Sequence, residues 1–151
     1  MKLTAKARSA VTALADIAAQ RGGDGAATPV PLRDIAGRQR LSVAFLEQIF
    51  GKLRKEGLVH SARGAGGGYL LAAAPDSISV SAVVRAMDEE IRSTACQPGS
   101  VIGCTGTSVR CLTHGLWHDL DQMIEGYLEG VSLADITAQA SVAEERVSED
   151  A

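Results

Sequence analysis

The sequence predicts a mainly α-helical protein with one small β-hairpin and a long helix near its C-terminus. Hydrophobic residues make up 46% of the 151 positions, which is enough to build a core. Only one Trp, two Tyr and two Phe are present, so aliphatic side chains must fill the interior, and this suits packed helices. Apolar residues recur at helical spacing in several segments, and a glycine cluster separates two short apolar runs.

Residues 3–20 form the first expected helix. Its apolar residues recur every three or four positions and share one stripe: Leu3, Ala7, Ala10, Val11, Leu14 and Ile17. Three glycines and two prolines in "RGGDGAATPVP" end this pattern, so we expect a loop there.

Two short helices are expected next. The first covers residues 32–40 and turns Leu32, Ile35 and Ala36 inward. The second lies in "LSVAFLEQIFGKLRKEG", where Ser42 is a suitable N-cap and Gly57 suits the position just after the last turn. Its inward face is expected to contain Phe45 or Leu46, Ile49, Phe50 and Leu53. Two short helices joined by a tight junction indicate a helix-turn-helix.

Residues 58–62 and 69–73 can each form a strand, with the glycines between them in a turn. A hairpin directly after a helix-turn-helix is the wing of a winged-helix domain, which we assign to residues 1–75. The run "RGAGGGY" is not a phosphate-binding loop, because no Lys-Ser or Lys-Thr follows and the next segment is a strand. A turn tipped by Arg63 instead suits the DNA minor groove.

The charges of the two halves support contact between the first half and a polyanion. Residues 1–70 have a net charge of +6, and residues 71–151 have a net charge of −9. Residues near the start of the second short helix are expected to read bases in the major groove: Ser42, Ala44, Phe45, Glu47 and Gln48. Other basic residues are expected to bind phosphates: Arg54, Lys55, Lys2, Lys6 and Arg8. The expected partner is double-stranded DNA.

The second half is expected to be organised around one further short helix and one long one. A connecting helix in residues 76–92 turns Val80, Val83, Val84 and Met87 inward. A loop at 93–114 follows, and then a long helical segment at 112–136 whose regular part is residues 112–129. "VSLADI" is expected to form one last turn or a short helix, and residues 137–151 a flexible acidic tail. We find no internal repeat.

No apolar run approaches the roughly 18 residues of a membrane helix, so no membrane partner is expected. The N-terminus is basic and then amphipathic, without the continuous apolar region of a signal peptide. We therefore expect a cytoplasmic protein, in which thiols stay reduced and a cysteine cluster is more often metal-binding or redox-active than structural.

All three cysteines lie in "CQPGSVIGCTGTSVRCLTHGLW", separated by seven and then six residues. Three cysteines and a histidine within nineteen residues indicate a metal site. Both a structural zinc ion and an iron–sulfur cluster accept this donor set. The wide, glycine-rich intervals suit a larger group than the usual Cys-x₂-Cys zinc knuckle.

Four segments resemble the IscR family of bacterial winged-helix regulators: "KLTAKARSAVTAL", "LEQIFGKLRKEGLV", "RGAGGGYLL" and "CLTHGLWHDL". The resemblance extends to about residue 136. It implies a [2Fe–2S] cluster held by Cys96, Cys104, Cys111 and His114. His118 is an alternative ligand one turn further on. This sequence differs from that family in the spacing of its cysteines, which are separated by seven and six residues here and by five and five residues in the family.

The resemblance also implies a homodimer that represses, and in places activates, the genes of cluster assembly, whose machinery donates the cluster. The expected dimer contacts are apolar residues of the long helix: Leu116, Leu120, Met123, Ile124 and Tyr127. The related NsrR family senses nitric oxide with a [4Fe–4S] cluster. The cysteine segment is also compatible with a DNA-binding protein that has a structural zinc or a disulfide switch, and with a small electron carrier. No catalytic constellation stands out, so an enzyme is not expected.

Overall fold

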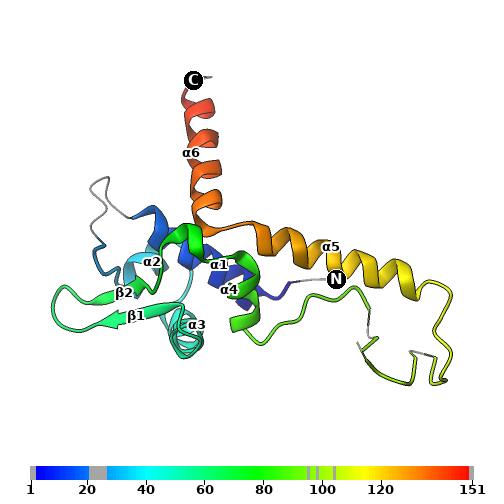
Figure 1. Ribbon diagram of the computed structural model, residues 1–151. Coiled ribbons are helices and arrows are strands. Elements are labelled where there is room, and N and C mark those ends of the chain that lie inside the picture. The colour runs from blue at the N-terminus through cyan, green and yellow to red at the C-terminus, as the bar shows by residue number, and fades with distance from the viewer. Residues whose placement is uncertain (1–2, 21–26, 95, 98, 104, 150–151) are drawn as a thin grey trace.

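The computed structural model describes residues 3–20, 27–94, 96, 97, 99–103 and 105–149. Three helices, a two-stranded hairpin and a fourth helix pack into one body, and two longer helices extend from it in different directions (Figure 1). In chain order the elements are α1 (Ala5–Ala19), α2 (Leu32–Gln39), α3 (Val43–Lys55), β1 (Val59–Ala62), β2 (Gly68–Leu71), the 3₁₀ turn η1 (Pro75–Ser77), α4 (Val80–Ala86), α5 (His114–Gly130) and α6 (Leu133–Glu149).

Helix α1 is the centre of the body and contacts α2, α3, α4, α6 and β2. Thr4 caps its N-terminus, where the hydroxyl accepts a hydrogen bond of 3.3 Å from the N–H of Ala7. Ala7, Ala10 and Ala13 are fully buried. Because these side chains are small, neighbouring helices can approach α1 closely, and the predicted apolar stripe of this helix is confirmed.

The helix-turn-helix forms as predicted. Arg40 adopts a left-handed conformation with φ of 55° at the end of α2, and its N–H donates to the carbonyl of Ala36. The Ser42 hydroxyl then caps α3 by accepting a hydrogen bond of 3.1 Å from the N–H of Phe45. At the other end Gly57 has a φ of 73°, and the N–H of Leu58 donates to the carbonyl of Leu53 at 2.9 Å. This Schellman arrangement confirms Gly57 as the residue that ends the helix.

The hairpin is antiparallel and pairs Val59 with Leu71 and Ala62 with Gly68. Segment 27–31 lies beside it, because Val30 forms an isolated bridge with Tyr69. A Cβ atom at Gly68 would lie 2.4 Å from the carbonyl carbon of Val30. Glycine is therefore required at this position by the close approach of another backbone.

Helix α4 is shorter than predicted. The sequence pattern indicated a helix through most of 76–92, but the chain forms a 3₁₀ turn from Pro75 to Ser77 and α4 begins only after Ser79. The Ser79 hydroxyl accepts a hydrogen bond of 3.1 Å from the N–H of Ala82, which sets this start. The helix ends before Asp88, whose φ of 59° is left-handed.

Helix α6 is the main difference from the expected fold. The sequence suggested at most a short helix after residue 131, whereas α6 has 17 residues. Ser132 and Asp135 form a capping box, in which the N–H of Asp135 donates to the Ser132 hydroxyl at 3.1 Å. Leu133 is fully buried, and its N–H donates to the carbonyl of Ile78 at 3.0 Å. The start of α6 is thereby fixed to the body.

The break at Val131–Ser132 also divides the expected segment 112–136 into α5 and the beginning of α6. In the described part of the chain, no helix has both the length and the apolar character that a membrane span requires.

Candidate DNA interface and cysteine cavity

The first half of α3 presents a polar surface. Ser42, Ala44, Glu47 and Gln48 are exposed, as expected of residues that read bases. Phe45 is half-buried and packs against the core, so only part of its ring is accessible. The opposite face of the helix is fully buried and consists of Leu46, Ile49, Phe50 and Leu53.

Most of the predicted phosphate-binding residues lie on the surface. Arg8, Arg54 and Lys55 are exposed, and Lys6 is half-buried at the start of α1. Arg63 is exposed at the beginning of the hairpin turn, where Gly64 has a φ of 105°. Lys2 lies outside the described residues.

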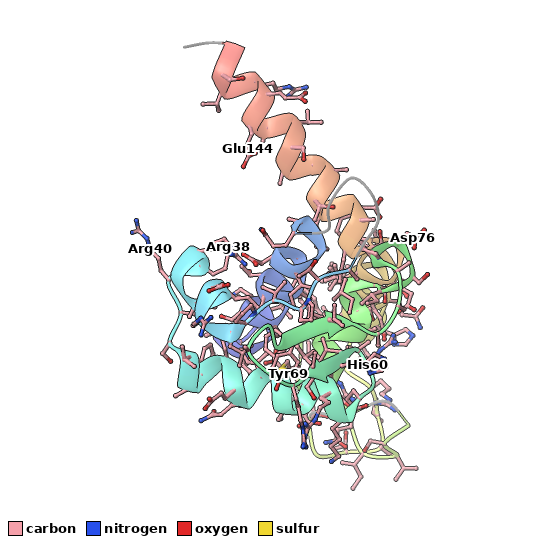
Figure 2. The ribbon with its side chains drawn as sticks, turned by 90° about the vertical axis from the view of Figure 1, so that its left-hand side faces the viewer. Arg38, Arg40, His60, Tyr69, Asp76 and Glu144 are labelled. Atoms are coloured by element: carbon pink, nitrogen blue, oxygen red, sulfur yellow. The ribbon has the colours of Figure 1, made fainter. Side chains whose placement is uncertain are left out.

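Arg40 is a candidate DNA-binding residue that the sequence reasoning missed. It lies in the turn between α2 and α3, two residues before the cap of α3, and its side chain points away from the body (Figure 2). Arg33 on α2 is also highly exposed. The sequence feature that could have identified these residues is the group of basic residues in and before the helix-turn-helix junction.

A second unpredicted feature is a buried carboxylate that joins α1 to α2. The Asp16 side chain is 2% exposed. It accepts hydrogen bonds from Arg38 Nη2 at 2.7 Å and from Gln39 Nε2 at 2.8 Å. The hydrogen bond that Arg38 donates to Asp16 raises the pKa of Arg38 above its ordinary value. Asp16 therefore fixes the first helix of the helix-turn-helix against the central helix.

A cavity of about 690 Å³ lies between α4, the segment that follows it and α5. Cys96 and His114 both line it, together with Trp117 and His118. The rings of His114 and His118 are stacked, with centroids 6.3 Å apart and planes 18° from parallel. Two of the four predicted ligands thus face the same cavity.

Cys111 is not among the residues that line this cavity. The Cys111 carbonyl accepts a hydrogen bond of 3.1 Å from the N–H of His114, and its Sγ lies 3.7 Å from Thr113 Oγ1. Cys104 lies outside the described residues. Among the residues that are described, no three His, Cys, Asp or Glu side chains meet in a group that could hold a metal ion.

Ionic and polar contacts fix the cavity walls. Arg85 of α4 donates to Glu125 at 2.8 Å and to Glu129 at 3.1 Å, both on α5. The hydrogen bond that Arg85 donates to Glu125 raises the pKa of Arg85 above its ordinary value. The N–H of Ser93 donates to Asp121 Oδ1 at 2.6 Å. One face of α5 is therefore attached to α4 and the segment after it.

Another part of α5 is apolar and open to solvent. Leu116, Leu120, Met123 and Tyr127 are all exposed large hydrophobic residues, and Ile124 is half-buried. The first four lie three or four positions apart, so they form one stripe along the helix. The sequence predicted these residues as dimer contacts, and their exposure in the single chain leaves them available for that role.

Comparison with known proteins places the chain in a family. The profile of the Rrf2 family, described as "Iron-dependent Transcriptional regulator", matches residues 3–139. The HTH-type transcriptional regulator IscR of Aliivibrio salmonicida is 49% identical over 144 residues, which cover 94% of this chain and 80% of the relative. IscR of Erwinia tasmaniensis is 50% identical over 136 residues, covering 90% and 78%.

Two solved structures have the same fold. CymR, the global cysteine regulator of B. subtilis, superposes with a TM-score of 0.76 at 27% identity, covering 92% of this chain and 98% of that one. IscR of T. potens superposes with a TM-score of 0.73 at 34% identity, covering 95% and 90%. The predicted winged-helix fold is confirmed. The relatives are named as transcriptional regulators and not as enzymes, in agreement with the sequence prediction. The chain belongs to the Rrf2 family of transcriptional regulators.

Proposed function

We propose that the protein is an iron–sulfur cluster-sensing transcriptional regulator. It binds promoter DNA as a homodimer, acts mainly as a repressor, and controls genes of iron–sulfur cluster assembly. The observation that carries the proposal is the cavity that Cys96 and His114 share in a chain with an exposed helix-turn-helix. The name IscR of the relatives supports the same function.

The proposed ligands of a [2Fe–2S] cluster are Cys96, Cys104, Cys111 and His114. The donor set fits chemically, because thiolates and imidazole are the side chains that ligate such clusters. A bound cluster would supply a redox-sensitive and removable cross-link within the loop. A neutral imidazole places less negative charge on the site than a fourth thiolate would, and it gives the loop a ligand that releases more readily.

In the proposed complex, two chains pair through the exposed stripe of α5. The pairing places two α3 helices in successive major grooves, about 34–36 Å apart, on a pseudo-palindromic site. Glu47 is the residue proposed to make site choice depend on the state of the cluster. Its carboxylate can accept a hydrogen bond from a cytosine amino group but repels phosphates. The position of the Glu47 side chain therefore decides which operator sequences the protein binds.

Anaerobic reconstitution with ferrous iron and a sulfide donor tests the proposal. We expect a coloured protein whose iron and acid-labile sulfide counts match one [2Fe–2S] cluster per chain, and loss of the visible absorbance in Cys104→Ala. Affinities of the reconstituted and apo forms for two classes of operator should differ. A colourless protein that retains zinc would indicate a structural metal instead. Equal operator profiles for both forms would refute sensing by the cluster.

A further inference from the structure

We propose that Asp88 and Glu89 are positioning residues that connect the cysteine cavity to the DNA-binding helices. This inference rests on the proposed function, because it concerns how the cavity influences DNA binding. Asp88 and Glu89 line the same cavity as Cys96 and His114. They follow α4 and its C-cap Met87, so they lie in the chain between the winged-helix body and the cysteine segment.

Asp88 contacts α3, the second helix of the helix-turn-helix. Its carboxylate forms an ion pair with Nζ of Lys52 on α3. Lys52 foremost, and also the charges of Lys55 on α3 and Lys6 on α1, lower the pKa of Asp88 below its ordinary value. Two of them, Lys55 and Lys6, are predicted phosphate contacts. Asp88 therefore offsets positive charge beside the DNA-binding face.

Glu89 contacts the central helix. Its carboxylate accepts a hydrogen bond of 3.2 Å from the N–H of Thr4 and a second one from the Thr4 hydroxyl. Thr4 is the N-cap of α1, the helix that contacts most of the body. Adjacent carboxylates thus attach one short segment to both α1 and α3.

The backbone makes this segment a defined element. Asp88 has a left-handed φ of 59°, which non-glycine residues adopt rarely. Its N–H donates to the carbonyl of Arg85 at 3.0 Å, and the Arg85 side chain pairs with Glu125 and Glu129 of α5. A movement of α5 relative to α4 would therefore act on Asp88 through Arg85, which contacts both α5 and Asp88.

The consequence concerns Lys52. While segment 88–90 is held in place, Asp88 neutralises Lys52 and fixes the C-terminal part of α3. When the segment shifts, Lys52 becomes available to phosphate and α3 is less constrained. Loading of the cavity then changes DNA affinity because the two positions of the segment bind DNA differently, which is a population shift.

Asp88→Asn tests the inference, because asparagine tolerates the left-handed conformation and removes only the charge. The measurement is the ratio of operator Kd values for apo and reconstituted protein. We expect this ratio to move toward one by about two- to fivefold, the effect of losing an exposed ion pair. Visible absorbance and iron per chain should stay at the wild-type level.

Two further variants make the result specific. Lys52→Gln should change the ratio similarly, and the double variant should add nothing further, since both single changes remove the same ion pair. Asp76→Asn, an exposed carboxylate on η1 outside the cavity, is the matched control and should leave the ratio unchanged.

The outcomes separate the two proposals. A D88N protein that binds its cluster and keeps the full wild-type ratio would overturn this inference alone. A wild-type protein that takes up no iron and sulfide would overturn the proposed function, and this inference with it.

Discussion

Arg38 donates hydrogen bonds from both Nε and Nη2 to the carboxylate of Asp16, at distances down to 2.7 Å. Asp16 lies on the central helix and Arg38 on the first helix of the helix-turn-helix. The pair is separated by 22 residues in the sequence and fixes the orientation of the module that carries α3.

Asp16→Ala is expected to destabilise the protein by roughly 2–3 kcal/mol. The change leaves Arg38 and Gln39 without their shared acceptor, but the effect is smaller than for a fully buried pair because Arg38 is partly solvated. Urea unfolding monitored by circular dichroism measures the difference. Asp34→Ala removes an exposed carboxylate from α2 and should change stability by less than about 0.5 kcal/mol. Equal losses of stability in both variants would contradict the role of Asp16 as the acceptor that joins α1 to α2.

Arg40→Ala is expected to weaken operator binding similarly for all sequences. Because Arg40 is expected to neutralise one phosphate, its loss should make the negative slope of log K against log salt shallower by about 0.9. Fluorescence anisotropy at several salt concentrations measures this slope. Arg146→Ala, an exposed arginine on α6, is the control. An unchanged slope in R40A would place Arg40 outside the DNA interface.

His114→Ala is expected to lose most of the visible absorbance after anaerobic reconstitution, because it removes one of four proposed ligands. His118→Ala should retain the spectrum and the iron content. Both residues line the cavity and their rings stack, so each substitution opens similar space beside the same wall. The opposite pattern would identify His118 as the ligand.

Met123→Glu is expected to convert the proposed dimer into monomers without unfolding the protein. Met123 is 72% exposed in the single chain, so a charge there is tolerated by the protomer but is costly inside a dimer contact. Analytical ultracentrifugation measures the change. Val142→Glu places the same charge at an exposed valine of α6 and should leave the association state unchanged. A dimeric M123E would show that the chains pair elsewhere.

The attachment of α6 is expected to weaken in acid. Hydrogen bonds from the N–H and hydroxyl of Ser132, at 2.8 and 2.9 Å, lower the pKa of Asp135. Because the pKa of Asp135 is lower in the folded than in the unfolded state, its carboxylate stabilises the fold at any pH above the unfolded-state pKa. This contribution is lost as the pH falls below about 4. Circular dichroism of Asp135→Asn should show less of this acid-dependent loss of helix than the wild type. Glu144→Gln, further along α6, should behave as wild type.

The elements with strong apolar periodicity could be predicted from the sequence. The stripe of α1 and the ends of α3 at Ser42 and Gly57 depend on local chemistry, namely helical spacing, a capping hydroxyl and a residue that accepts positive φ. The two strands were also placed within two residues of their observed bounds, since the glycines between them leave little choice.

Contacts between distant residues account for what could not be predicted. Helix α6 is rich in alanine and polar residues, so its pattern is weak, and Leu133 is buried only because Ile78 and the core lie beside it. Asp16 looks like a polar interruption of the α1 stripe until Arg38 and Gln39 are brought to it. The ligand set stays a prediction for the same reason: the ligands are far apart in the loop, and the local sequence pattern does not encode the contacts that would bring them together.

The close approach at Gly68 divides the hairpin into a part that tolerates redesign and a part that does not. Apart from the chain neighbours of Gly66, no atom of the described residues lies within 4 Å of a Cβ added there, whereas a side chain at Gly68 would collide with the backbone of Val30. Side chains could be introduced at the tip of the wing to lengthen its reach or change its charge, while the base stays clamped. A combinatorial library confined to positions 65 and 66 would therefore explore new operator preferences on an unaltered scaffold.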